Sequence, residues 1–332
     1  MGEHYPRIRH QISGPDGVRL LVREVVRIAF YMPYDHHDLA EGVARALDAY
    51  VRAVREEPEA LCHGWDTEGE GDAFPLDAEG WKDIRRCLVP ETRYRFLDEL
   101  AEDSPLFLRR TKKQFEASII LTGGAAEPNG HEFSYQARLP WRSPPEGSVS
   151  VLSVTLPTEY LEAHGEERVR VLAEELASGL RFSTGHAGLA FGLLGTRSRV
   201  MPRIREDVLR YPGLDVPGAG SALSLGGRVD GVHWLNFLGP PVLVALGGAA
   251  GVRARLHSPG SIVVDQGGER ALVALGKAPE AGDLAEGRDL PAYRELARVL
   301  EPWLGELQPQ DLSAWRGFTE DEVRRWWRRF LD

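Results

Sequence analysis

The chain has 332 residues, of which 42% are hydrophobic and 27% are charged, and its formal net charge is −10 at pH 7. This balance is typical of a globular protein with a substantial core and excludes a disordered chain. The two cysteines, Cys62 and Cys87, have no C-x-x-C spacing, which argues against a zinc ribbon or a disulfide scaffold. The N-terminal sequence has no apolar signal segment, and the apolar run at 242–252 falls short of the roughly 20 residues of a spanning helix. We therefore expect a cytoplasmic protein.

The negative charge is concentrated between residues 56 and 103. This segment contains fifteen acidic and five basic residues. Such a segment repels nucleic acid and attracts a basic protein surface. A solvated acidic loop that serves solubility explains the same charge, so both alternatives stay open.

The first predicted elements are a strand and a helix. Residues 19–34 (RLLVREVVRIAFYMPY) alternate and then run apolar, which predicts a strand or a strand pair. Apolar residues at helical spacing from Leu39 to Val54 predict an amphipathic helix. Asp38, with Glu41 three residues later, is predicted to cap that helix.

The sequence YDHHDL at 34–39 places two histidines between two carboxylates, which raises the question of a metal or acid–base site. His36 and His37 are adjacent and would diverge in an extended chain. Neither has the i, i+4 partner of an H-E-x-x-H helix. We therefore expect polar residues at a strand-to-helix junction, with no metal and no cofactor.

The middle of the chain has a similar order of elements. Strands are predicted at 115–121, 131–139 and 150–156, then a turn at 157–160 and a helix at 166–180. The parallel with the first strand and helix suggests two related α/β halves, 1–143 and 144–332, packed together and joined by a linker at 140–147. The predicted fold class is α/β (α+β), with mixed sheets and flanking helices.

The C-terminal half is predicted to continue in the same style. Its expected elements are a strand at 186–191, a basic helix at 201–211, a strand at 232–238, a short helix at 242–246, and an antiparallel meander at 253–256, 261–265 and 270–275. Two helices close the chain, and the last begins at Thr319 with Glu322 as its capping partner. Its aromatic residues are predicted to be core, and its arginines solvated or paired with acids.

Motifs of catalysis are missing from the sequence. There is no G-x-S-x-G elbow and no Walker loop, and the G-x-G at Gly218 lacks the third glycine of a dinucleotide fingerprint. Four arginines between 197 and 205 would suit either an anion site or one face of a helix. We expect no catalytic residues and no enzyme.

Three passages resemble the TsiV-type immunity proteins of type VI secretion systems. They are FYMPYDHHDLAEGVARALDAYV, RYPGLDVPGAGSALSLGGRVDGVHWLNFLGPPVLVALGG and LSAWRGFTEDEVRRWWRRF. The runs at 211–215 and 231–239 are the most specific. The resemblance implies a cytoplasmic, non-catalytic α/β protein that binds a cognate antibacterial effector. Such effectors are often nucleases, and immunity covers the active or substrate-binding surface.

The resemblance does not identify the residues that touch the effector. Because a DNA-cutting enzyme presents a basic cleft, we assign the contact to the acidic loop WDTEGEGDAF. Its partner-binding residues by hypothesis are Trp65, Asp66, Glu68, Glu70, Asp72 and Phe74. A regulatory or scaffold protein and an enzyme stay open as alternatives. A gene neighbourhood without a toxin would favour the former, and a pocket holding a perturbed His36, His37 or His233 would favour the latter.

Overall fold

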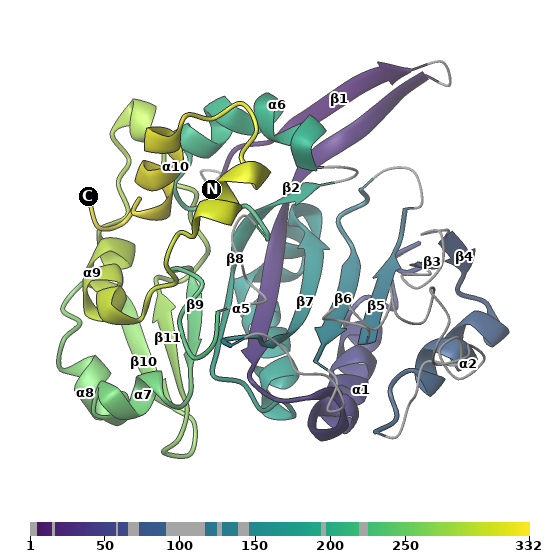
Figure 1. The fold of residues 1–332 in the computed structure, drawn as a ribbon, viewed down its shortest axis with the longest axis horizontal. Coiled ribbons are helices and arrows are strands. Elements are labelled where there is room, and N and C mark those ends of the chain that lie inside the picture. Colours follow the sequence, from purple (N-terminus) through teal and green to yellow (C-terminus); the bar gives the residue numbers. More distant parts are fainter. Residues whose placement is uncertain are drawn as a thin grey trace.

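One antiparallel sheet runs through the molecule (Figure 1). The computed structural model describes residues 5–14, 17–57, 59–65, 73–90, 117–124, 128–138, 146–193, 197–218 and 225–332. The strands in these ranges form an 11-stranded sheet of order β10-β11-β9-β8-β2-β7-β6-β5-β3-β4, with β1 paired to β2. The expected α+β class with flanking helices is confirmed.

The strands follow the alternating and apolar runs of the sequence. Their bounds are β1 Arg9–Gly14, β2 Gly17–Met32, β3 His63–Trp65, β4 Ala73–Pro75, β5 Ala117–Thr122, β6 Glu132–Ala137, β7 Ser150–Pro157, β8 Thr184–Leu193, β9 Leu235–Leu238, β10 Ser261–Asp265 and β11 Ala271–Leu275. Strand β2 is the centre of the sheet, because it pairs with β7 on one side and with β8 on the other.

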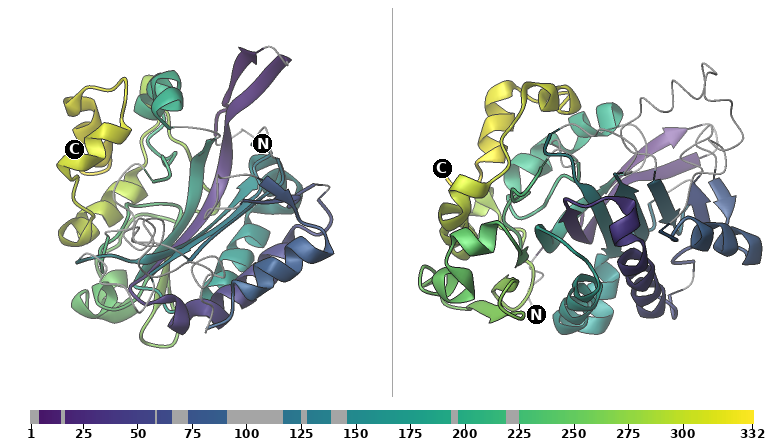
Figure 2. Two further views of the ribbon diagram at one scale, coloured as in Figure 1. Left: turned by 45° about the vertical axis from the view of Figure 1, so that its right-hand side comes forward. Right: turned by 60° about the horizontal axis from the view of Figure 1, so that its bottom comes forward.

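The helices flank this sheet. They are α1 His36–Ala53, α2 Ala78–Arg86, α5 Thr158–Ser178, α6 Arg197–Arg210, α7 Val242–Ala245, α8 Gly248–Arg253, α9 Pro291–Leu300 and α10 Glu320–Trp327, with short 3-10 turns at Leu284–Glu286, Glu301–Trp303 and Pro309–Ala314. Helices α1 and α5 pack side by side against one face of the sheet (Figure 1 and Figure 2). Gly42 permits this contact, because a Cβ there would lie 2.3 Å from the carbonyl oxygen of Gly179.

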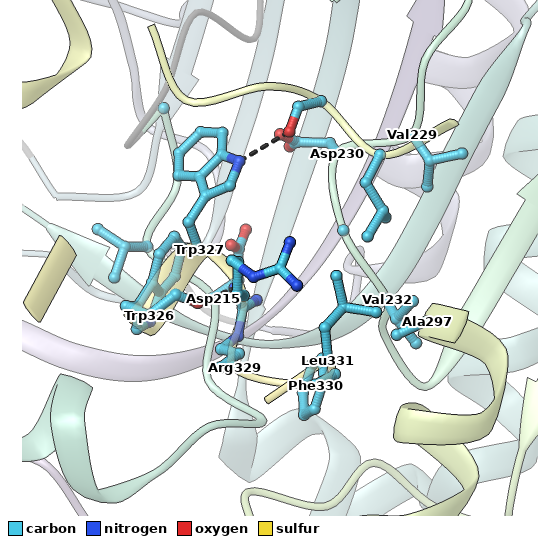
Figure 3. A pocket seen from close by; sticks show the side chains of 16 residues that line it. Asp215, Val229, Asp230, Val232, Ala297, Trp326, Trp327, Arg329, Phe330 and Leu331 are labelled. Atoms are coloured by element: carbon cyan, nitrogen blue, oxygen red, sulfur yellow. Dashed lines mark hydrogen bonds between the residues drawn. The ribbon is translucent and has the colours of Figure 1, made fainter. Parts of the chain in front are cut away.

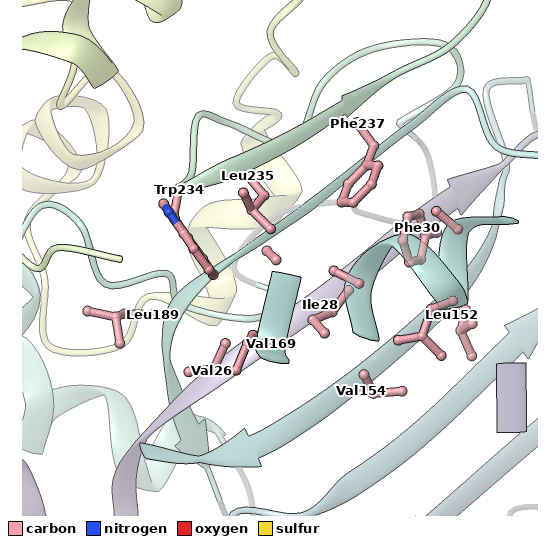
Figure 4. Close-up of a cluster of buried hydrophobic side chains, with 14 of the residues drawn as sticks. Val26, Ile28, Phe30, Leu152, Val154, Val169, Leu189, Trp234, Leu235 and Phe237 are labelled. Carbon is pink, nitrogen blue, oxygen red and sulfur yellow. The ribbon is translucent and has the colours of Figure 1, made fainter. Parts of the chain in front are cut away.

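The apolar core lies between that face and the two helices (Figure 4). Alternate residues of β2, among them Ile28 and Phe30, are at most 1% exposed. Phe30 contacts the rings of Phe182 and Phe237, with ring centroids 5.3 and 5.2 Å away. Because burying such a side chain contributes about 1.5–3 kcal/mol, this layer is the main source of stability.

The other face of the sheet is divided. Over β8 it is covered by the chain between α6 and β9 and by α10. Over β5, β6 and β7 the residues facing away from α1 and α5 are partly exposed, as the alternating burial of β6 and β7 shows. The polar residues described below lie on this face.

Three local expectations were wrong. The turn expected at 157–160 is helical, because α5 begins at Thr158, and the break falls instead at Gly165, whose φ is +80°. The strand expected at 253–256 does not form, since α8 occupies the chain up to Arg253. Asp38 does not cap α1, because the helix begins at His36 and Asp35 is its N-cap residue.

The closing helix agrees with its prediction. Thr319 and Glu322 form the capping box of α10, and the buried residues of the helix include Val323 and Trp326. Arg324 pairs with Glu320, as expected, but Arg329, which follows the helix, is half-buried over the ring of Trp326 and departs from the prediction.

Strands from both predicted halves belong to the same sheet, because β2 lies between β7 and β8. Most of the linker at 140–147 lies outside the described residues. The division at 143/144 stays a prediction. None of the described helices combines the length and apolarity needed to cross a bilayer.

Candidate functional site

The proposed contact residues lie at one edge of the sheet. Strands β3 and β4 form a hairpin in which Gly64 pairs with Phe74 and Trp65 pairs with Ala73. The two aromatic side chains therefore point to opposite faces of the hairpin. Trp65 Nε1 donates to Thr122 Oγ1 at 2.9 Å, which fixes the hairpin to β5. The four acidic residues, Asp66, Glu68, Glu70 and Asp72, lie outside the described residues.

The histidine cluster before α1 is a structural junction. His36 is 2% exposed, with Nδ1 3.2 Å from the Tyr135 hydroxyl and Nε2 3.1 Å from the carbonyl oxygen of Val89. Burial lowers its pKa, so the ring is neutral at pH 7. His37 and Asp38 are exposed. The structure thus separates the two histidines, as expected for adjacent residues.

The structure brings together a different polar cluster, which the sequence did not reveal. We call it the Arg27 cluster, and its members are Arg27, Tyr31, His186, Asp215, Asp230, His233 and Arg329. Arg27 on β2 is 4% exposed. Its Nη1 donates to Asp215 Oδ2 at 3.0 Å and lies 3.1 Å from His186 Nε2.

Two backbone features place the cluster. The chain after α6 runs beside β8, where the Asp215 amide donates to the carbonyl oxygen of Leu189 at 2.9 Å. Farther along, Asn236 fixes the loop before β9 by accepting from the amide of His233 at 3.0 Å and donating to its carbonyl oxygen at 2.7 Å. Gly188 leaves room for the His233 ring, because a Cβ there would lie 3.2 Å from His233 Cβ.

The charges of the Arg27 cluster balance. Burial lowers the pKa of His186 well below its usual value and that of His233 to about 4, so both rings are neutral at pH 7. Burial also lowers the pKa of Arg329, to about 10, which leaves it cationic. Burial and Asp215 raise the pKa of Asp230 to about 6. Two cations therefore face two carboxylates, and Tyr31 donates its hydroxyl to Asp230.

The cluster is a poor metal site despite its residue types. His186, Asp215 and His233 offer ligand atoms within 4.8 Å of one another. However, the two rings are stacked, with centroids 3.7 Å apart and planes 15° apart. The nitrogen lone pairs of two stacked rings lie in two nearly parallel planes, whereas the lone pairs of metal ligands must converge on one point. The guanidinium of Arg27 also occupies the space beside Asp215 and His186.

A cavity of about 40 Å³ adjoins the cluster, lined by Asp215, Asp230 and α10 (Figure 3). This volume has room for only a few water molecules. Metabolite pockets measure several hundred Å³. The cavity is thus too small for an ordinary substrate and His233 does not line it, so the arrangement is suited to fixing the fold rather than to chemistry.

Sequence reasoning named only His233 among these polar residues, because no spacing joins them. Asp215 and His233 belong, however, to the two runs that carry the family resemblance, at 211–215 and 231–239. The sequence does not show that these two runs meet at Arg27, so the cluster could be identified only from the structure.

The comparisons with known proteins agree with this fold. The family model TsiV, described as type VI immunity for VRR-NUC, matches residues 42–330. A solved Pseudomonas aeruginosa T6SS protein, PA0821, has a similar fold, with a TM-score of 0.66 and 20% identity over 99% of this chain and 92% of that chain. Comparison with curated proteins gave no match. Because the family match spans most of the chain, including the residues 215–233 of the Arg27 cluster, the protein belongs to the TsiV family of type VI immunity proteins.

Proposed function

We propose that this protein is a cytoplasmic immunity protein that binds a VRR-NUC effector of a type VI secretion system and neutralises it by occluding its active or substrate-binding surface. The observation that carries the proposal is the family match over residues 42–330. The effector on this proposal is a nuclease with a basic cleft, because a DNA-cutting enzyme must hold phosphates.

The charge of the chain supports such a partner. The segment 56–103 carries a surplus of acidic residues within a chain of net charge −10. Long-range attraction between this segment and a basic cleft would raise the rate of encounter. The proposed contact surface is the loop between β3 and β4 with its flanking residues Trp65 and Phe74, at the edge of the sheet.

An enzyme is less well supported. The Arg27 cluster holds the perturbed histidines that catalysis would need, but its carboxylates are matched by Arg27 and Arg329 and its cavity is about 40 Å³. A scaffold or regulatory protein would share the fold and differ in having no effector gene beside its own.

The direct test uses the purified chain and the VRR-NUC protein encoded beside its gene. We expect a stoichiometric complex, loss of DNA cleavage in proportion to the immunity protein added, and survival of cells that express both. A wild-type chain that neither binds nor inhibits this protein would contradict the proposal.

A second experiment tests the contact surface alone. A variant with Asp66→Asn, Glu68→Gln, Glu70→Gln and Asp72→Asn should associate more slowly and show a flatter dependence on salt, because exposed charges are screened beyond about 8–10 Å. The dissociation rate should change less. An unchanged association rate and salt slope would remove this loop from the interface while leaving the immunity function standing.

A further inference from the structure

A second cavity, of about 260 Å³, opens on the polar face of the sheet beside β6. Its lining includes Glu132, together with Thr122 of β5 and Thr155 of β7. These three residues are directly opposite one another across the strands. The strand register therefore places one carboxylate between two hydroxyl groups.

Glu132 has no hydrogen-bond or ion-pair partner among the described residues, although it is partly buried. Thr122 donates its hydroxyl to the carbonyl oxygen of Gly124 at 3.1 Å, and Thr155 donates to that of Gly130 at 2.8 Å. Neither hydroxyl hydrogen is then available to the carboxylate. Burial raises the pKa of Glu132, which is the expected effect on a carboxyl group that water solvates poorly.

The nearby cations donate to other acceptors, although Arg27 also lines the cavity and its charge opposes the burial that raises the pKa of Glu132. Arg27 donates Nε to Ser153 Oγ at 3.0 Å and Nη1 to Asp215. Arg23 donates to the carbonyl oxygen of Asn129 and pairs with Glu159. Burial lowers the pKa of His131, which also lines the cavity, to about 4, so this ring is neutral. The cavity therefore presents a carboxylate that no described residue contacts through a hydrogen bond, beside hydroxyl oxygens whose lone pairs can accept.

We propose that this cavity receives a lysine or arginine side chain of the effector, with Glu132 as its ion-pair partner. The inference rests on the proposed function. A cationic group is the occupant that matches a lone carboxylate flanked by hydrogen-bond acceptors. A cavity of about 260 Å³ has room for one long side chain. A nuclease cleft is a surface rich in such side chains.

The position of the cavity agrees with the proposed contact surface. Thr122, which lines the cavity, accepts the indole hydrogen of Trp65. The hairpin of β3 and β4 and the cavity thus meet at one residue of β5. An effector bound to the hairpin would extend over the cavity without a change in the sheet.

The test compares the affinity of two matched variants for the VRR-NUC protein encoded beside the gene. Glu132→Gln keeps the shape of the side chain and removes its charge, and we expect at least a ten-fold weaker Kd, mainly through faster dissociation. Glu41→Gln is the control, because Glu41 is exposed on α1 at the opposite face of the sheet. The control should bind within about two-fold of wild type.

A second variant tests whether weaker binding results from loss of the contact or from loss of folding. Ser134→Lys places an ammonium group two residues along β6 on the same face as Glu132, where it competes with the incoming cation. This variant should also weaken binding while its Tm stays at or above that of wild type. If both variants bind as tightly as wild type, the cavity is not a contact and the immunity function stands. If the wild-type chain itself does not bind, both the function and this inference are wrong.

Discussion

Two polar regions lie on the same face of the sheet and share strands β2 and β8, but only in one of them do the carboxylates have arginine partners. In the Arg27 cluster, two carboxylates face two guanidinium groups and two neutral imidazoles, around a cavity of about 40 Å³. Around Glu132, a carboxylate faces a cavity of about 260 Å³ with no partner among the described residues. Ser153 stands at the boundary, because it accepts from Arg27 and lines the larger cavity.

This difference distinguishes charged residues that stabilise the fold from a charged residue that is available to bind a partner. A buried charge that is paired and hydrogen-bonded holds segments of the chain in register, and removing one partner is costly. A carboxylate that is desolvated without a partner costs stability, so its presence points to a role outside folding. The same chemical group therefore has opposite consequences at two places on one face of the sheet.

Replacing Arg27 should give the largest effect. Arg27→Met removes the cation that pairs with Asp215 and leaves the two carboxylates with Arg329 alone, so we expect the free energy of unfolding to fall by about 3–5 kcal/mol. Urea unfolding of the purified protein measures this. Arg170→Met is the control, since Arg170 forms exposed pairs with Glu167 and Glu174, which are worth under about 1 kcal/mol. Equal losses in the two variants would contradict the architectural role of Arg27.

The second-largest effect should be a loss of stability of the folded chain at acidic pH, through the histidines of the Arg27 cluster. The pKa values of His186 and His233 are lower in the folded chain than the unfolded value of about 6.5, so below that pH the unfolded chain binds protons that the folded chain does not. Stability should therefore fall as the pH drops from about 6.5 towards 4. Asp230, with its pKa raised to about 6, opposes this trend with one proton.

The histidine contribution is measurable by difference. His233→Asn should make the dependence of the unfolding free energy on pH shallower by about 1 kcal/mol per pH unit between pH 6 and pH 5. His257→Asn, at an exposed position, should leave the slope unchanged. Urea unfolding at pH 7, 6 and 5 gives all three slopes, and the idea fails if the wild-type and His233→Asn slopes coincide.

Removing a single hydroxyl should cost less. Tyr31→Phe deletes the hydrogen bond from Tyr31 to Asp230 and leaves Arg27, 4.0 Å away, as the nearest cation to that carboxylate. We expect a loss of about 1–2 kcal/mol in the free energy of unfolding. Thermal and urea unfolding should agree on this value. A neutral result would show that water satisfies Asp230 as well as Tyr31 does.

The smallest expected effect has the opposite sign. Glu132→Met, the counterpart of Arg27→Met, removes a desolvated carboxylate that has no partner, so the unfolding free energy should stay constant or rise by up to about 1 kcal/mol. The same variant should lose effector affinity. A loss of stability larger than about 1 kcal/mol would show that Glu132 stabilises the fold, as Arg27 does, and would contradict the difference between the two regions.

Several elements of the fold were predictable from local pattern. Apolar alternation identified β2, β7 and β8, and helical spacing with a capping box identified α10. Prediction failed where neighbouring structure overrode the local signal. The Asp38–Glu41 pair had the form of a capping box, but the helix begins three residues earlier than this box implies, at His36, whose ring contacts Tyr135 and Val89.

Prediction of the candidate sites from the sequence was limited in the same way. The acidic surplus at 56–103 and the passages that resemble TsiV proteins were visible in the order of residues, and the family match bears out the second. The assignment of the contact to residues 65–74 stays a prediction.

The sequence by itself determined the alternation of strands and helices, the uneven charge and the family, because each of these depends on neighbours in the chain or on whole runs of residues. Only the tertiary structure decided that Arg27, His186, Asp215 and His233 meet, since strand order and a loop paired to β8 bring residues up to 206 positions apart into contact. It also decided which carboxylates are matched. Glu132 and Asp215 are both acids near strands in the sequence, but burial, register and the direction of each neighbouring donor give one of them a partner and leave the other without one.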